Sequence, residues 1–112
     1  MADATLERWV DAAPVFAALG DETRLRLFGL LVKEGPLSIA ALAAEVDVSR
    51  QAVTKHLEVL SNAGLVSGSR AGRQTSWTVD GRGLSRSTTL LEAISRQWDS
   101  RLARLRALVE DA

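Results

Sequence analysis

The strongest constraint on the fold is a pair of short helical segments joined by a tight link in the middle of the chain. Ser38 begins the segment SIAALAAEV, whose larger apolar residues recur at spacings of three and four and form one apolar face. Asp47 and Val48 form the link, and Ser49 begins the segment SRQAVTKHLEVLSNAGLV. Serine is a preferred N-cap because its hydroxyl accepts a hydrogen bond from a free N–H of the first turn. The order predicts a helix-turn-helix unit.

The second helix of this unit has two different halves. At 100° per residue, Leu57 and Leu60 fall within about 40° of Val53 and form a core stripe. Its N-terminal half instead gathers side chains that donate hydrogen bonds. These are Ser49, Arg50, Gln51, Thr54, Lys55 and His56. Base edges in the major groove and phosphates offer mostly acceptors, so a helix that docks on DNA needs donors at this end. The free N–H groups and the positive dipole end of the helix also favour phosphate.

A β-hairpin is predicted after this helix. Segments 65–70 and 74–79 have strand-like patterns and are joined through residues 71–73. Arg70, Arg73 and Gln74 gather near the tip, where they suit contacts with phosphates or the minor groove. An ordinary exposed turn is the alternative for the hairpin alone, and the helix and hairpin together are the more specific signal.

The distribution of charge also points to a polyanion. The net charge is zero, yet residues 1–49 carry four basic and eight acidic side chains. Residues 50–86 carry six basic and two acidic side chains, and residues 87–112 carry four of each. A local basic segment is the electrostatic footprint of nucleic-acid binding, with a simple solvated surface as the alternative.

Two helices are predicted before the helix-turn-helix unit. The first spans 12–20, with Asp11 as its cap and Pro14 in its first turn, where no hydrogen bond is lost. The second spans 21–34 and is capped by Asp21. Apolar residues cover most of its circumference, which predicts a central, buried helix. They are Leu25, Leu27, Phe28, Leu30, Leu31 and Val32.

A long helix is predicted at the C-terminal end. It begins near Leu84 or Thr88, after a loop at 80–83, and runs to about Val109. Its apolar residues recur at spacings of 3, 4, 4, 3 and 4, which gives a narrow apolar seam. Little core remains for this seam to cover, so its simplest partner is a second copy of the chain, with folding back onto its own domain as the alternative. The predicted dimer interface is Leu6, Trp9, Val10, Phe16, Leu91, Ile94, Trp98, Leu102, Leu105 and Val109.

Composition argues against several other classes. The chain has no cysteine, one histidine, no phosphate-cradling glycine loop and no serine with an evident base, so no enzyme is predicted. No window approaches the roughly 20 apolar residues of a membrane span, and no signal peptide is evident, so a cytoplasmic location is expected. The length of 112 residues fits a single domain spanning 1–112. Trp9 and Trp98 are interpreted as interface anchors, with a ligand pocket between subunits as the alternative.

Three stretches, VFAALGDETRLRLFGLL, LSIAALAAEVDVSRQAVTKHLEVLSNAGLV and AGRQTSWTV, resemble the arsenic-repressor (ArsR) family of transcriptional regulators. The resemblance covers roughly residues 12–80, and the helix at 84–109 has the place of the family's dimerisation helix. It implies a mainly α-helical winged helix-turn-helix fold and a homodimer joined by the first and last helices. It also implies repression through an inverted-repeat operator in double-stranded DNA. The family's DNA-contacting positions fall on the donor residues of 49–56 named above and on Arg70, Arg73 and Gln74.

The chain departs from the metal-sensing members that it resembles. Many members bind metal through cysteines in the helix before the recognition helix, where this chain has Ser38 and Ala40. The other common site uses Asp, His and Glu of the terminal helix, which here contains no histidine. No metal or other cofactor is therefore expected, although a site built wholly from carboxylates stays open. A small-molecule inducer and activation instead of repression also stay open. The alternative function is a winged-helix module that binds protein and not DNA.

Overall fold

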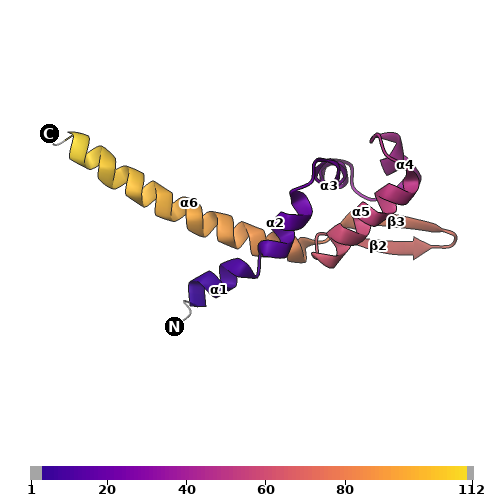
Figure 1. Ribbon diagram of the computed structural model, residues 1–112, viewed down its shortest axis with the longest axis horizontal. Helices are drawn as coiled ribbons and strands as arrows, with labels where there is room; N and C mark the ends of the chain where they lie inside the picture. The colour runs from indigo at the N-terminus through magenta and orange to yellow at the C-terminus, as the bar shows by residue number, and fades with distance from the viewer. Residues whose placement is uncertain (1–3, 111–112) are drawn as a thin grey trace.

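The computed structural model describes residues 4–110, in which a long C-terminal helix extends away from the helices and strands of the middle of the chain (Figure 1). The principal extents are 67 × 34 × 20 Å. The helices are α1 (Ala4–Val10), α2 (Ala13–Leu19), α3 (Glu22–Glu34), α4 (Ile39–Ala44), α5 (Arg50–Asn62) and α6 (Gly81–Glu110). The strands are β1 (Leu37–Ser38), β2 (Val66–Ala71) and β3 (Gln74–Val79). The predicted winged helix-turn-helix order is confirmed.

The three strands form one antiparallel sheet in the order β1-β3-β2. Strands β2 and β3 pair from Val66–Val79 to Ala71–Gln74, and their connection is the two-residue turn of Gly72 and Arg73. Gly72 has a φ of 65°, which suits the first position of such a turn because glycine has no Cβ. The predicted hairpin is confirmed, with the first strand shifted by one residue and the second at its predicted bounds. Strand β1 was not predicted, because two residues are too short to show an alternating pattern.

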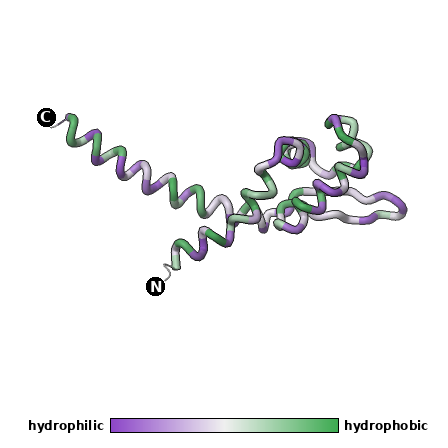
Figure 2. Tube along the Cα trace, viewed as in Figure 1, coloured by the Kyte–Doolittle hydropathy of each residue, from purple (hydrophilic) through white to green (hydrophobic). Residues whose placement is uncertain are grey.

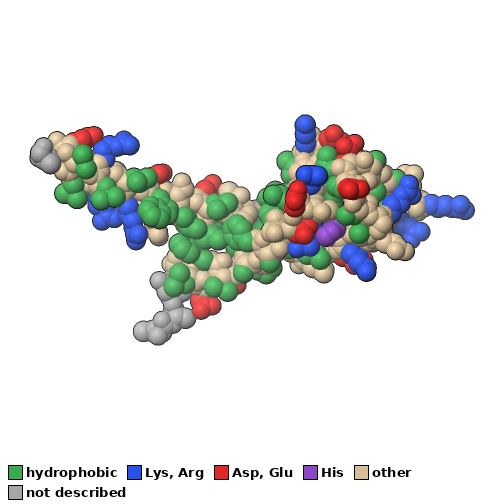
Figure 3. All heavy atoms as spheres, turned by 45° about the horizontal axis from the view of Figure 1, so that its top comes forward, with side chains coloured by type: hydrophobic (Ala, Val, Ile, Leu, Met, Phe, Trp, Pro, Cys, Tyr) green, Lys and Arg blue, Asp and Glu red, His purple; other side chains and the backbone are tan. Residues whose placement is uncertain are grey.

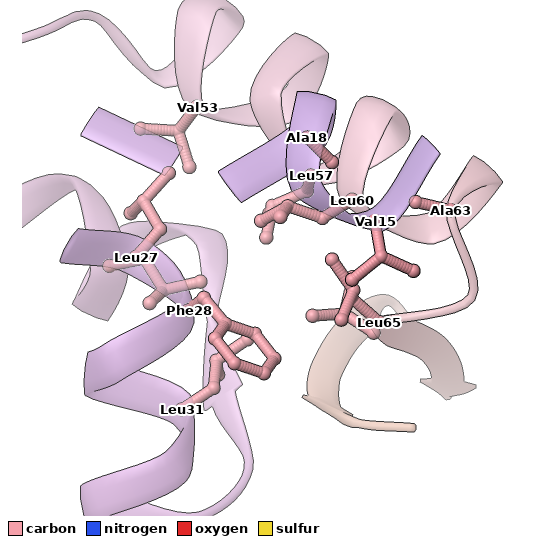
Figure 4. Packing of buried hydrophobic residues seen from close by; sticks show 12 residues of the cluster. Val15, Ala18, Leu27, Phe28, Leu31, Val53, Leu57, Leu60, Ala63 and Leu65 are labelled. Atoms are coloured by element: carbon pink, nitrogen blue, oxygen red, sulfur yellow. The ribbon is translucent and has the colours of Figure 1, made fainter. Parts of the chain in front are cut away.

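The buried core lies between α2, α3, α4, α5 and the start of β2 (Figure 4). The predicted stripe of Val53, Leu57 and Leu60 is fully buried, so this prediction is confirmed. The prediction that α3 is buried all round is wrong, because Leu25 and Val32 are 53% and 59% exposed. Helix α3 packs against α2, α5 and β3, and these neighbours cover only the side that carries its buried residues. Those residues are Leu27, Phe28 and Leu31.

Three of the four predicted helix caps are confirmed. The side chains of Asp21, Ser38 and Ser49 accept backbone N–H groups of α3, α4 and α5 over 3.0, 3.1 and 3.2 Å. The prediction for Asp11 is wrong, because the residue before α2 is Ala12 and no side chain caps this helix. Ala12 has helical angles of −84° and −8°, and its N–H bonds back to Trp9 of α1. The chain therefore turns almost directly from α1 into α2, without the extended residue that a side-chain cap requires.

The link between α4 and α5 is longer than predicted. Helix α4 ends at Ala44, where the N–H of Glu45 closes a tight last turn on the carbonyl of Leu42 over 3.1 Å. Five residues, 45–49, therefore connect the two helices instead of the predicted two. Helices α4 and α5 nevertheless pack against each other, so the helix-turn-helix arrangement holds.

Helix α6 begins earlier than predicted, at Gly81, in the segment expected to be a loop. The carboxylate of Asp80 accepts the backbone N–H of Arg82 over 3.0 Å and organises the first turn. The N–H of Gly83 donates to the carbonyl of Gly64 over 2.8 Å, which joins the start of α6 to the end of α5. These contacts offset the poor helix propensity of two glycines in the first three residues.

Candidate nucleic-acid interface

Helix α5 buries the stripe of Val53, Leu57 and Leu60 and presents polar side chains of its N-terminal half to solvent. The side chains of Arg50, Gln51 and Lys55 are exposed on its surface. Within residues 4–110 none of these three side chains takes part in a hydrogen bond or an ion pair. Their donors are therefore free for a ligand, and guanidinium, amide and ammonium groups match the acceptors on guanine, adenine and phosphate.

Two hydroxyls of the same region are partly engaged within the helix. Ser49 Oγ accepts the N–H of Ala52 as the cap, which leaves its proton available for an outside acceptor. Thr54 Oγ1 donates to the carbonyl of Arg50 over 3.0 Å and lies at an intermediate exposure. In this structure Thr54 keeps its proton inside the helix, and its oxygen lone pairs stay available.

His56 lies apart from the other donors and faces α3. Its Nδ1 is 3.4 Å from Nη1 of Arg24 and 4.0 Å from Oδ2 of Asp21, and its side chain is only 23% exposed. The pKa of the Asp21 carboxyl is lowered, chiefly by the hydrogen bond from the backbone N–H of Arg24. The sequence did not single out Arg24. Its contact with His56 joins positions 32 residues apart, a relationship that no local pattern shows.

The wing carries the other predicted site residues. Arg73 and Gln74 are exposed at the two-residue turn, and Arg70 donates through Nε to the carbonyl of Gly72 over 3.2 Å. Positive side chains gather at the end of the molecule where β2 and β3 turn (Figure 3). Behind the tip, Trp77 pairs with Gly68 in the strand register and its ring lies over that glycine. The wing is thus a braced hairpin with an unpaired arginine at its tip.

The predicted interface residues lie on α1, α2 and α6 and are largely open to solvent. Apolar residues recur along α6 (Figure 2), and Leu91, Trp98 and Leu102 are each between 54% and 57% exposed. A hollow of about 240 Å³ between α1 and α6 is lined by Trp9, Ile94, Gln97, Trp98 and Arg101. The remaining predicted residues also lie on these helices. They are Leu6, Val10, Phe16, Leu105 and Val109.

Two other kinds of site are not seen in the part of the chain that the structure describes. Among residues 4–110, no three histidine or acidic side chains lie together as a group able to hold a metal ion. Over the same range, no helix combines the length and apolar character needed to cross a membrane.

A donor-rich helix α5, packed on α4 and flanked by an arginine-tipped hairpin, defines a winged helix-turn-helix DNA-binding protein. A helix-turn-helix domain family matches residues 19–68, and the chain is 37% identical over 93 residues to the HTH-type transcriptional regulator Rv2034 of Mycobacterium tuberculosis, covering 83% of each chain. The chain belongs to the ArsR family of transcriptional regulators, and its function is DNA-binding regulation of transcription.

Solved structures agree with this assignment. An ArsR-like transcriptional regulator from Rhodococcus sp. RHA1 matches with a TM-score of 0.72 and 38% identity, covering 89% of this chain and 93% of that one. A homodimeric winged helix-turn-helix DNA-binding domain from Mycobacterium bovis matches with a TM-score of 0.65, covering 87% and 89%. Its identity of 23% shows the common fold. The family and fold class expected from the sequence are therefore confirmed.

Proposed function

We propose that the protein is a homodimeric repressor that binds an inverted-repeat operator and competes with RNA polymerase at a promoter. The observation that carries this proposal is the exposed, unpaired set of Arg50, Gln51 and Lys55 at the start of α5. In a helix-turn-helix protein this end of the second helix faces base edges in the major groove. The wing reaches the adjacent backbone or minor groove through Arg70, Arg73 and Gln74.

Within the proposed site, the residues have different tasks. Arg50, Gln51 and Lys55 contact bases and phosphates. Ser49 donates its hydroxyl proton to a DNA phosphate near the helix N-terminus, and Thr54 does the same once its hydroxyl turns away from the carbonyl of Arg50. His56 belongs to the same helix but faces Arg24. It therefore affects DNA binding by helping to orient α5. No cofactor, metal or catalytic activity is part of the proposal.

The proposed dimer places α1, α2 and α6 of the two copies together. Side chains such as Leu91, Trp98 and Leu102 are exposed in one copy, and burying them against a second copy removes apolar surface from water. A two-fold dimer then presents two α5 helices to half-sites about 34–36 Å apart. The hollow beside Trp9 and Trp98 is filled by packing in this arrangement. A regulator of this kind acts in the cytoplasm, and an inducer acts on it there if one exists.

The test is binding of the purified protein to labelled DNA from just upstream of its own gene, across a salt titration. Lys55→Ala is measured in parallel. Tight, sequence-preferring binding that weakens with salt is expected, and Lys55→Ala weakens it with some loss of sequence preference. A folded dimer that shows no binding at low salt would instead favour a module that binds protein.

A further inference from the structure

Helix α5 packs against α2, α3, α4 and β2, and two polar contacts connect it further towards the proposed dimer surface. The first is at its C-terminal end, where the carbonyl of Gly64 accepts the N–H of Gly83 in α6 over 2.8 Å. The second is halfway along the helix, where His56 meets Arg24. The buried stripe of Val53, Leu57 and Leu60 holds α5 in the core, and the two polar contacts restrict the tilt that this packing allows.

Arg24 also hydrogen-bonds to the C-terminal end of α2. Its Nε donates to the carbonyl of Ala18 over 2.7 Å, and its Nη2 donates to the carbonyl of Ala17 over 3.5 Å. The last carbonyls of a helix have no partner within that helix, so a guanidinium that donates to them stabilises its C-terminus. Helix α2 carries Phe16, one of the residues of the proposed dimer surface, and Phe16 is 39% exposed.

The contact with His56 has a defined direction. A guanidinium has donors and no acceptor, so Nδ1 of His56 must be the acceptor of Arg24 Nη1 at 3.4 Å. The neutral ring then carries its proton on Nε2. Asp21 Oδ2 is 4.0 Å from the same Nδ1, beyond hydrogen-bond reach, but it accepts the backbone N–H of Arg24 and holds that residue at the start of α3.

We propose that Arg24 is a positioning residue that sets the direction of the recognition helix relative to the dimerisation helices. The inference rests on the proposed homodimer, because the direction of α5 in each copy then decides which half-site spacing the pair fits. At 1.5 Å per residue, His56 lies about 12 Å and Arg50 about 20 Å along the helix from Gly64. A tilt about the Gly64–Gly83 junction therefore moves the DNA-facing end of α5 most.

One test examines the contact itself. His56 is the only histidine in the chain, so its imidazole nitrogens give a single set of NMR signals. At a pH where the ring is neutral, we expect the tautomer protonated on Nε2. A ring protonated on Nδ1 would overturn the proposal, since that nitrogen could not accept from Arg24.

A second test measures spacing preference on DNA. The probe is the smallest duplex that the wild-type protein protects upstream of its gene, with its centre lengthened or shortened by one base pair. For the wild type, each change is expected to weaken binding by about tenfold, equivalent to about 1.4 kcal/mol. For Arg24→Leu and His56→Leu, we expect weaker binding to the original duplex and unchanged binding to the two altered duplexes. The ratio of the affinity for the original duplex to the affinity for an altered duplex therefore falls towards one.

Matched variants separate positioning from general damage. Asparagine places an amide oxygen close to the position of Nδ1, so His56→Asn is expected to keep the wild-type ratio. A residue with only a structural role would weaken binding to all three duplexes alike and leave the ratio unchanged, which would overturn the proposal. If Arg24→Leu fails to fold, the comparison of His56→Leu with His56→Asn still tests the proposal. Equal affinity ratios for these two variants would also overturn the proposal.

The two proposals fail in different ways. A wild-type protein that protects no DNA removes the proposed repressor function and this inference together. A wild-type protein with sharp spacing preference, unchanged in the Arg24 and His56 variants, removes only the inference. A dimer that binds DNA with no spacing preference also removes the inference and leaves the repressor function standing.

Discussion

Gly83 of α6 lies directly against Gly64 at the end of α5, and a Cβ built on Gly83 would lie 2.7 Å from the carbonyl oxygen of Gly64. This separation is too short for any side chain, so the two backbones must move apart if glycine is replaced. The junction of the recognition helix with the long helix therefore depends on the absence of one methyl group.

Replacing Gly83 by alanine should consequently destabilise the fold. The expected cost is about 1–3 kcal/mol, as for other substitutions that overfill a packed contact, measured by thermal or urea unfolding. The matched control is Gly81→Ala, because a Cβ at Gly81 meets nothing within 4 Å. Gly81→Ala should change the free energy of unfolding by no more than about 0.5 kcal/mol. Equal effects of the two substitutions would contradict the close-contact explanation.

Arg73 at the wing tip should contribute to DNA affinity through phosphate. We expect Arg73→Ala to weaken binding to specific and unrelated DNA alike and to reduce the salt slope by about one. Binding isotherms at several salt concentrations give this slope. Arg106→Ala, near the far end of α6, removes the same charge away from the wing and should leave the slope unchanged (Figure 1). A slope unaltered by Arg73→Ala would mean that the wing does not reach the backbone.

A charge in the seam of α6 should separate the dimer. Ile94→Glu places a carboxylate beside Trp9 and Trp98, where burial against a second copy would remove that charge from water. Sedimentation should show monomers that bind DNA poorly. Ser100→Glu is the control, since Ser100 is exposed and lies about 200° around the helix from Trp98. Persistence of the Ile94→Glu dimer at micromolar concentration would refute the interface.

The ion pair at the start of α6 should make stability depend on pH. The pKa of Asp80 is lowered from 3.8 to about 2, first by side-chain hydrogen bonds from Arg82 and then by the Arg82 backbone N–H. A lowered folded-state pKa stabilises the protein above the unfolded value of 3.8, and this contribution is lost as the pH falls towards 2. At neutral pH the wild-type protein should therefore have a higher melting temperature than Asp80→Asn.

The difference in melting temperature between these two proteins should shrink below about pH 4 and be largely gone near pH 2. Asparagine is as good a helix cap as aspartate, so the comparison isolates the charge. A difference that stays constant from pH 7 to pH 2 would show that the carboxylate charge is not the cause.

The sequence predicted the elements whose signals are local. Ser38, Ser49 and Asp21 stand where a polar cap precedes a helix, and all three accept the expected N–H groups. The apolar stripe of α5 and the two strands of the hairpin follow from periods of 3.6 and 2 residues. Both periods can be read from a short continuous segment of the sequence. The donor set of 49–56 stands out in the sequence because its polar residues gather at one end of the helix, and its contact with DNA stays a prediction.

The errors concern features that depend on distant partners. Asp11 has the chemistry of a cap, but the chain there remains helical and leaves it no N–H to accept. The start of α6 depends on Gly64. Leu25 and Val32 look like core residues, but only the arrangement of α2, α5 and β3 decides which side of α3 is covered.

The exposed seam of α6 has a consequence for how such a regulator responds to its own abundance. If two chains must meet before the seam is covered, the concentration of competent protein rises with the square of the chain concentration while monomers predominate. Operator occupancy then rises more steeply than synthesis. The apolar face of one helix would in this way give the regulated gene a threshold, without any ligand.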